Sequence, residues 1–205
     1  MIIDLTHTIM EGMPVYPGDE ETRLEHSRQF GKDGYNNHQL SINMHAGTHI
    51  DGPMHLLDVV KYISEISAES FVGEGVLLDV SGAAAVDYRD EYEEVIKQSQ
   101  IVILYTGHGE QYGRPEYFTD YPVLTADFVQ LLIRKKIKMV GLDTPSPDHY
   151  PFESHKSLFR NQIFIIENLN NVNRLLGVKA FEIIALPLRI QADSSMARVI
   201  ARVLE

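Results

Sequence analysis

Short apolar runs, bounded by turn-forming residues, recur along most of the chain. Runs of roughly four to eight residues rich in Val, Ile and Leu are typical of buried β-strands. This pattern predicts strands in the following segments: Ile2–Leu5, Gly75–Val80, Ile101–Tyr105, Lys138–Leu142 and Gln162–Ile166. Two further β-rich segments, Phe181–Ile190 and Met196–Leu204, end the sequence, and the last of them is also compatible with a helix.

Nearer the N-terminus the pattern changes to an alternation of polar and apolar residues. Glu21–Phe30 and His38–Met44 alternate in this way, which favours two β-strands. The turn Lys32–Gly34 separates them, and the Pro- and Gly-containing segment Met13–Asp19 is predicted to be a loop. The second strand is expected to lead directly into residues 45–55. Loops that follow strands commonly hold functional side chains, so this is a suitable place for a site.

Two segments carry helix signals. Tyr88–Gln98 lies between two predicted strands, and the acidic residues around its start favour the helix dipole. Thr125–Lys135 forms the second helix, with Thr125 as the candidate N-cap residue. A strand-helix-strand order followed by closing strands predicts an α/β fold with both parallel and antiparallel pairing.

Composition narrows the function mainly by exclusion. The 205 residues, 44% hydrophobic and 23% charged, suit one globular domain over residues 1–205. A formal net charge of -11 argues against binding to the phosphate backbone of nucleic acids. No basic leader region precedes an apolar run, and no run approaches the roughly 20 residues of a membrane span, so we expect a cytoplasmic protein. The chain has no cysteine, so any metal ion must be bound through nitrogen and oxygen.

The segment His45-Ala-Gly-Thr-His49-Ile-Asp51-Gly-Pro-Met-His55 concentrates three imidazoles and a carboxylate. Neutral imidazole and carboxylate are ordinary ligands of zinc, and they also suit manganese or iron. A single histidine is more often a surface or packed core residue, but four candidate ligands at this spacing are poorly explained by chance. Gly47 and Pro53 interrupt the segment, so we place it at the end of a strand running into a loop. The motif predicts a metal-dependent hydrolase.

Other polar residues follow predicted strands. Gly141–Asp148 contains Asp143 and Ser146, which could face a cleft, although Pro-rich turns with such residues are commonly structural. His155 and Glu167 are weak evidence by themselves, since an acidic residue at the end of an apolar strand usually meets water.

The remaining histidines divide into two groups. His7 and His108 lie in predicted turns and could line a pocket. Three others are expected to be surface or structural residues: His26, His38 and His149.

The motif His45-x-Gly-Thr-His49-x-Asp51-x-Pro-x-His55 closely resembles the signature of the cyclase family, which contains bacterial kynurenine formamidase and isatin hydrolase. The resemblance covers most of the chain. It includes these further segments: Asp4-Leu5-Thr6-His7, Tyr16-Pro17-Gly18-Asp19, Gly141-Leu142-Asp143, and His155 followed by Ile165-Ile166-Glu167-Asn168-Leu169.

The resemblance implies a residue-by-residue assignment of the site. One divalent ion would be bound by His45, His49 and Asp51, with Asp51 also facing a second ion that His155 and Glu167 complete. Zinc is favoured and manganese is possible, with one or two ions in each subunit. His55 matches the residue that donates and accepts the proton, and Tyr16 matches an aromatic position, often Trp, beside the substrate. The residues themselves leave open that His55 is an additional metal ligand or a partner of one.

The resemblance also implies a fold, an assembly and an activity. The fold is a swivelling β/β/α domain with mixed sheets and a β-barrel-like core, assembled as a homodimer or homotetramer. The expected activity is metal-dependent hydrolysis of a small aryl formamide, with N-formylkynurenine as the candidate, giving kynurenine and formate in tryptophan catabolism. Ring opening of a cyclic amide is the alternative within the family. A non-catalytic protein that binds metal or a small molecule is the alternative of another class.

Overall fold

Eight strands form one mixed sheet, and seven of them close into a barrel. The computed structural model describes residues 1–204. Strand order is β1-β12-β11-β5-β7-β9-β10-β4, and the barrel closes because β12 also pairs with β4. These strands span Ile2–Asp4 (β1), His49–Asp51 (β4), Val72–Asp79 (β5), Ile101–Tyr105 (β7), Met139–Leu142 (β9), Phe164–Glu167 (β10), Phe181–Pro187 (β11) and Ser194–Val203 (β12).

Parallel and antiparallel pairing both occur, as predicted. The pairs β5–β7, β7–β9 and β9–β10 are parallel, whereas β4, β11, β12 and β1 pair antiparallel with their neighbours. The predicted α/β class and the barrel-like core of a swivelling β/β/α domain are therefore confirmed.

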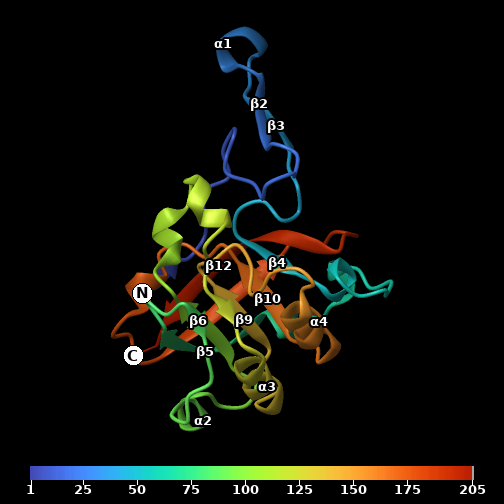
Figure 1. Cartoon of the computed structure of the whole chain (residues 1–205). Coiled ribbons are helices and arrows are strands. Elements are labelled where there is room, and N and C mark those ends of the chain that lie inside the picture. The colour runs from blue at the N-terminus through green and yellow to red at the C-terminus, as the bar shows by residue number, and fades with distance from the viewer. Residues whose placement is uncertain (205) are drawn as a thin grey trace.

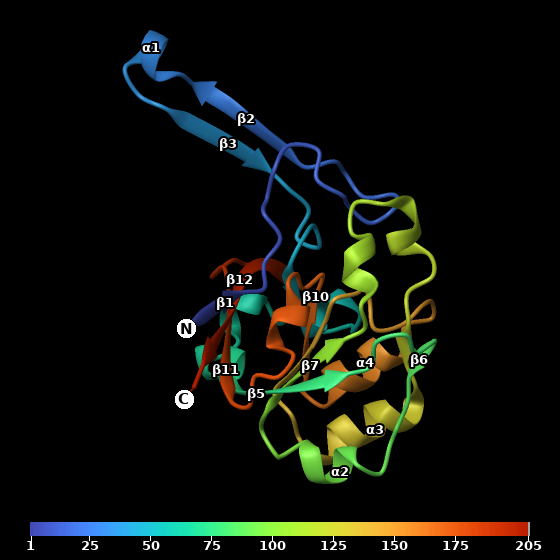
Figure 2. The ribbon, with the colours of Figure 1, turned by 90° about the vertical axis from the view of Figure 1, so that its left-hand side faces the viewer.

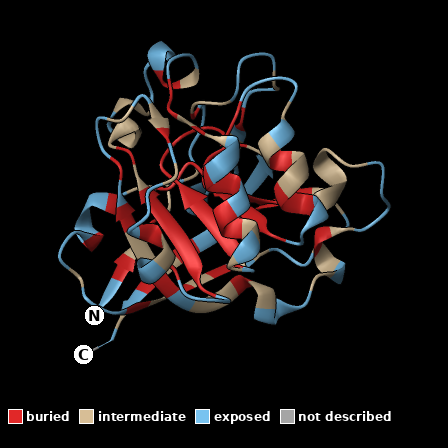
Figure 3. Cartoon of the chain, turned by 60° about the horizontal axis from the view of Figure 1, so that its bottom comes forward, coloured by how far each residue is buried: buried red, intermediate tan, exposed pale blue. Residues whose placement is uncertain are grey.

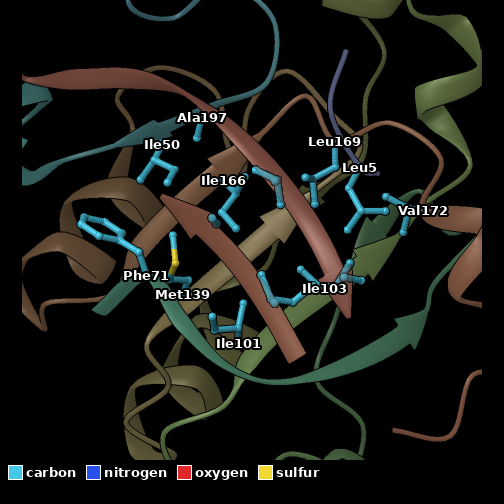
Figure 4. Close-up of a cluster of buried hydrophobic side chains, with 14 of the residues drawn as sticks. Leu5, Ile50, Phe71, Ile101, Ile103, Met139, Ile166, Leu169, Val172 and Ala197 are labelled. Atoms are coloured by element: carbon cyan, nitrogen blue, oxygen red, sulfur yellow. The ribbon is translucent and has the colours of Figure 1, made fainter. Parts of the chain in front are cut away.

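Alternation along the strands divides the apolar core into two layers. In β7, Ile101 and Ile103 belong to the cluster inside the barrel, whereas Val102 and Leu104 belong to the cluster between the barrel and its helices. Figure 4 shows the inner cluster, in which side chains from different strands meet between the ribbons. Figure 3 shows that the central strands of the sheet are buried and that the helices keep exposed outer faces.

Two helices cover the outer layer and contact each other: α3 (Ala126–Arg134) and α4 (Glu153–Arg160). The predicted N-cap of α3 is confirmed, because the Thr125 hydroxyl accepts a hydrogen bond from the Phe128 amide at 3.3 Å. Helix α4 was missed by the sequence patterns, since it is only eight residues long and its polar residues outnumber the apolar ones.

The helix predicted over Tyr88–Gln98 is largely wrong. Only α2, Tyr92–Val95, is α-helical. Tyr92 and Ile96 are buried there, while Val95 is exposed, so the segment has too small an apolar face to stabilise further turns. The final segment, left open between helix and strand, is the strand β12.

A two-stranded hairpin projects away from the barrel and forms an arm (Figures 1 and 2). It consists of β2 (Arg23–Arg28) and β3 (Asn37–Ser41), joined through the one-turn helix α1 (Phe30–Asp33). The two predicted strands of this region therefore exist. The expectation that the second one leads directly into the His/Asp segment is wrong, because β3 ends at Ser41 and a turn held by the Ala46 amide on the Asn43 carbonyl follows.

Short elements complete the chain. β6 (Ala85–Val86) and β8 (Val123–Leu124) form a small parallel pair. Single 3-10 turns occur at Pro53–His55 (η1), Ile63–Glu65, Ala68–Phe71, His108–Gln111, Pro115–Phe118 and Val172–Leu175. Within residues 1–204, no helix has the length and apolar character that crossing a bilayer requires.

Candidate metal centre and active site

The floor of the site is the outer face of β4 and β10. His49 and Asp51 lie two residues apart on β4 and therefore share a face, while Ile50 between them belongs to the barrel interior. Glu167 of β10 is directly opposite His49 in the antiparallel pair. The three polar side chains are at most 5% exposed. The sheet therefore brings the carboxylates of Asp51 and Glu167 into the protein, where little water can hydrate their charges.

Helix α4 adds His155 above this floor. Its Nε2 lies 3.2 Å from Glu167 Oε1 and 3.6 Å from Asp51 Oδ2. Its Nδ1 lies 2.5 Å from Asp148 Oδ1 on the opposite edge of the ring. The structure thus places His155 and Glu167 beside Asp51, as the resemblance implied.

His45 and His55 approach from the two ends of β4. His45 lies in the turn before the strand, with Nδ1 2.9 Å from Asp51 Oδ1. His55 ends the 3-10 turn η1, and its Nδ1 lies 3.4 Å from Asp193 Oδ2. The metal-ligand motif is therefore centred on a strand, not on a loop after one. The sequence did not predict this strand because β4 has only three residues and is buried through its pairing with β10 on one side and β12 on the other.

The donor atoms form two groups that share Asp51. One group is His45, His49 and Asp51, and the other is Asp51, His155 and Glu167; in each, the candidate donor atoms lie within 4.8 Å of one another. A further group within the described chain consists of His45, His55 and Asp193. All the donors are nitrogen or carboxylate oxygen, which is the set that zinc, manganese and iron accept.

Buried atoms without partners show that these residues fit a cation. His49 Nδ1 lies 2.8 Å from the Gly47 carbonyl oxygen and must donate to it, which leaves Nε2 as the nitrogen facing Asp51 and Glu167. In the described part of the chain, His49 Nε2 and both carboxylate oxygens of Asp51 are buried without a hydrogen-bond partner. A lone pair facing two carboxylates is unfavourable unless a proton or a metal ion lies between them.

Without a metal ion the histidines compensate by holding protons. Burial lowers the pKa of His45, but the nearby charge of Asp51 and the hydrogen bond to Asp193 outweigh it and raise the pKa to about 10. Burial likewise lowers the pKa of His49, and Asp51 and Glu167 raise it to about 9. Burial raises the pKa of Asp51, but the charges of His49 and His45 hold it well below its usual range. Protons and a metal ion therefore compete for the same nitrogens.

This competition predicts a pH-dependent effect of metal on stability. The raised pKa values of His45 and His49 stabilise the metal-free fold below pH 6.5, and that contribution is lost as pH rises through about 9 to 10. We expect the increase in Tm on adding zinc to be small at pH 6.5 and to grow toward pH 9, measured by calorimetry. An increase in Tm that shrinks over this range would contradict the prediction.

Asp148 supports the site from behind His155. Its Oδ2 accepts hydrogen bonds from the Ser154 and His155 amides at 2.7 and 3.1 Å, in the first turn of α4, while Oδ1 contacts the His155 ring. One carboxylate thus caps the helix and leaves His155 Nε2 facing Asp51 and Glu167. The sequence left the role of the 141–148 segment open, and Asp148 gives it a specific one.

Replacing Asp148 by Ala is expected to lower the free energy of unfolding by about 1–2 kcal/mol through loss of the cap. The same change should weaken metal binding by about 10–100-fold, because the His155 ring loses its partner. Denaturant unfolding and zinc titration measure the two effects. The matched variant Asp148→Asn keeps an oxygen for the helix amides, so it should recover part of the stability; equal zinc affinity in all three proteins would contradict the prediction.

A cavity of about 210 Å³ opens over the candidate metal ligands. His45, His55, His155 and Glu167 form its polar floor. Its walls are largely aromatic or apolar: Pro14, Val15, Tyr16, Leu56, Tyr112, Phe118, Pro145 and Phe152. Tyr16 meets Phe118 edge to face at 5.8 Å between ring centroids, so the loop before β2 and the turn at 115–118 form one aromatic wall.

Of the remaining polar residues singled out in the sequence, Ser146 lines the cavity and the others make contacts elsewhere in the protein. His7 is not among the cavity-lining residues; it stacks on Tyr112 at 3.6 Å, and burial lowers its pKa to about 4. His108 lies with Nε2 2.9 Å from the Tyr117 carbonyl oxygen. Asp143 accepts hydrogen bonds from Thr106 and Gly107. The other three histidines are exposed, as predicted: His26, His38 and His149.

Comparison with known proteins identifies the family. Residues 3–149 match the family model named Cyclase. The chain belongs to the cyclase family. The matched span contains Tyr16 and the segment from His45 to His55, whereas His155, Glu167 and Asp193 follow it.

Relatives of the cyclase family extend over the whole chain. An uncharacterised protein of Methanocaldococcus jannaschii is 34% identical over 98% of both sequences. A kynurenine formamidase of Bacillus cereus is 30% identical over 98% of this chain and 96% of its own. The structure of isatin hydrolase A from Labrenzia aggregata, bound to benzyl benzoate, matches with a TM-score of 0.87 and 27% identity over 100% of this chain and 94% of that one. The predicted family is confirmed, and so is the predicted enzyme class, a hydrolase.

Proposed function

We propose that this cyclase-family protein is a metal-dependent amidohydrolase that cleaves a small aryl formamide, with N-formylkynurenine as the first candidate. The observation that carries the proposal is the pair of ligand groups sharing Asp51 on the floor of an aromatic cavity, next to His55. The 30% identity to a kynurenine formamidase supports the choice of substrate. On this proposal the product is kynurenine, and the reaction belongs to tryptophan catabolism.

We assign the metal-binding role to five residues: His45, His49, Asp51, His155 and Glu167. When bound, a divalent ion supplies Lewis acidity, which polarises a carbonyl group and makes water acidic near neutral pH. Zinc is the favoured ion and manganese the alternative, because both accept nitrogen and carboxylate donors. Two ions fit the two groups, with Asp51 common to both, and a single ion would use one of them.

The other residues of the cavity would orient the substrate and move a proton. The ring of an aryl amide would lie against the aromatic wall of Tyr16 and Phe118. His55 faces the same cavity, and no protein hydrogen bond within residues 1–204 engages its Nε2. We propose that this nitrogen protonates the leaving amine, a role for which an imidazole is suited near neutral pH.

Ring opening of a cyclic amide is the second candidate. It is favoured by the similarity to isatin hydrolase A and by one feature of the cavity: none of its described lining residues is a Lys or Arg. A substrate with a free carboxylate, such as N-formylkynurenine, would therefore lack a cationic side chain to pair with. A neutral cyclic aryl amide needs no such partner.

The experiment is a comparison of substrates and metals. Hydrolysis of N-formylkynurenine and of isatin would be measured with protein loaded with zinc or with manganese, and chelated protein would serve as the blank. Metal-dependent turnover of N-formylkynurenine supports the proposal. Turnover of isatin alone moves the assignment to ring opening. Full metal occupancy with no turnover across a wider panel of amides and esters would support the non-catalytic binding protein instead.

We also propose that the chain forms a homodimer or homotetramer, with the arm covered by a second copy. A lone two-stranded hairpin is marginally stable in water. Every residue of β3 is exposed, and Phe30, Tyr35 and Leu40 of the arm are 69%, 54% and 43% exposed. A second copy would bury this apolar surface and stabilise the hairpin.

Replacing residues 23–41 by a short Gly-Ser linker is expected to give monomers, whereas the unaltered chain should have the mass of two or four chains. Size-exclusion chromatography with light scattering measures both. A monomeric unaltered chain at micromolar concentration would rule out the proposal, and an oligomer without the arm would rule out the arm as the contact.

Three predictions from length, composition and charge remain proposals. A single domain over residues 1–205 is supported by the pairing of β1 with β12, which joins the two ends of the chain in one sheet. A cytoplasmic location and the absence of nucleic-acid partners stay predictions from the sequence.

A further inference from the structure

Asp193 lies beside the proposed proton donor without belonging to either ligand group that shares Asp51. Its Oδ2 is 2.9 Å from His45 Nε2 and 3.4 Å from His55 Nδ1. The Ser194 hydroxyl lies 3.3 Å from the same oxygen. One carboxylate oxygen therefore faces a candidate ligand and the candidate proton donor together.

The backbone holds this carboxylate in place. Asp193 immediately precedes β12, whose Ser194 pairs with Asp51 of β4. The Gly52 amide donates to the Asp193 carbonyl oxygen at 3.1 Å, and a Cβ on Gly52 would lie only 2.5 Å from that oxygen. On the other side, the Ile63 amide donates to the Ala192 carbonyl oxygen at 2.9 Å. The approach of the two chain segments thus depends on glycine after Asp51, and it fixes the backbone from which the Asp193 side chain extends.

The chemistry of a carboxylate decides which ring nitrogens carry hydrogen. An ionised carboxylate only accepts hydrogen bonds, so the His45 nitrogen that hydrogen-bonds Asp193 must carry the hydrogen, and His55 Nδ1, 3.4 Å from the same oxygen, is placed to donate there as well. For His45 this hydrogen is on Nε2, which leaves Nδ1 as the free nitrogen, 2.9 Å from Asp51 Oδ1 and within the ligand group. In His55, a hydrogen on Nδ1 facing Asp193 would leave Nε2 as the nitrogen with a free lone pair.

We infer that Asp193 is a positioning residue that selects these tautomers of His45 and His55. In His45 the selection directs Nδ1 toward the metal-ligand group. In His55 it prepares Nε2 to accept a proton and pass it on. The second half rests on the proposed function, because the part of His55 in proton transfer belongs to it.

The test replaces Asp193 by Ala, which removes the acceptor, and by Asn, which keeps one acceptor oxygen but no charge. Asp58→Asn is the matched control, since Asp58 is an exposed carboxylate three residues after His55. Nitrogen-15 NMR of the histidine rings in zinc-loaded protein reports the tautomers. Zinc titration reports the support given to His45, and kcat and KM report the effect on turnover of whichever amide is hydrolysed.

In the unaltered protein and in Asp58→Asn, we expect His55 to carry its hydrogen on Nδ1. In Asp193→Ala this preference should be lost, zinc affinity should fall about 10–100-fold, and kcat should fall about 100-fold or more with little change in KM. Asp193→Asn should recover part of each loss, because its amide oxygen can still accept.

Two results would overturn the inference. An unchanged His55 tautomer in Asp193→Ala means that Asp193 does not select it. Loss of one full equivalent of zinc from that variant means that Asp193 is itself a ligand, in the group with His45 and His55. If the unaltered protein hydrolyses no amide, the proposed function fails, but the tautomer and zinc measurements still decide the role of Asp193.

Discussion

Replacing Asp51 by Asn is expected to abolish metal binding at both ligand groups and to stop turnover. Oδ1 of this carboxylate lies 2.9 Å from His45 Nδ1 and 3.2 Å from His49 Nε2, and Oδ2 lies 3.6 Å from His155 Nε2. An amide has no charge and can offer only one oxygen, so neither group keeps its full donor set. Lewis-acid stabilisation is worth several kcal/mol and each 1.4 kcal/mol is tenfold, so kcat/KM should fall by about 1,000-fold or more.

Metal content after dialysis and kcat/KM measure this prediction. Glu167→Gln is the informative comparison, since Glu167 belongs to only one of the two groups, and its loss should affect one ion and spare the other. Retention of normal metal content in Asp51→Asn would contradict the central place that we give to this residue.

Replacing His55 by Ala is expected to lower kcat by about 100- to 10,000-fold while leaving metal content unchanged. His55 lines the cavity but is absent from both ligand groups that share Asp51. Its loss should therefore remove the proton transfer and not the ion. Metal analysis and steady-state kinetics on the same preparation separate the two effects.

The opposite pattern has a clear meaning. If His55→Ala loses metal and regains part of its turnover when metal is added back, His55 is a ligand, in the group with His45 and Asp193. That result would also remove the reason for placing proton transfer at His55 Nε2.

Local patterns were sufficient for elements whose burial is visible in their own residues. The apolar run Ile101–Tyr105 became β7, and the signal at Thr125 marked the start of α3. Local patterns were insufficient for elements that are buried by strands distant in the sequence. β4 has only three residues, and two of them are polar, so its position within the barrel depends on β10 and β12. The helix predicted over Tyr88–Gln98 was wrong for a related reason: a short, mostly polar helix needs an apolar face packed against the protein to remain folded.

The candidate site also contains residues that local spacing could predict and residues that it could not. His45, His49, Asp51 and His55 are close in sequence, and their spacing was enough to indicate a metal centre. Asp193 carries no motif, because it meets His45 across a separation of 148 residues. The only local sign of it is a carboxylate placed directly before the last β-rich segment.

The sequence by itself determined the family and the donor chemistry on offer: nitrogen and oxygen as candidate ligands, no thiolate, and beside them a histidine to which we assign proton transfer. Only the tertiary structure decided how those donors are grouped. Closing the barrel puts β4 between β10 and β12, which sets Glu167 opposite His49 and places Asp193 next to the Asp51 pair. Packing of α4 then brings His155 and Asp148 over the same face. The physical reason is that donor identity is a property of single residues, whereas a shared carboxylate and a selected tautomer arise from distances between segments that chain order does not reveal.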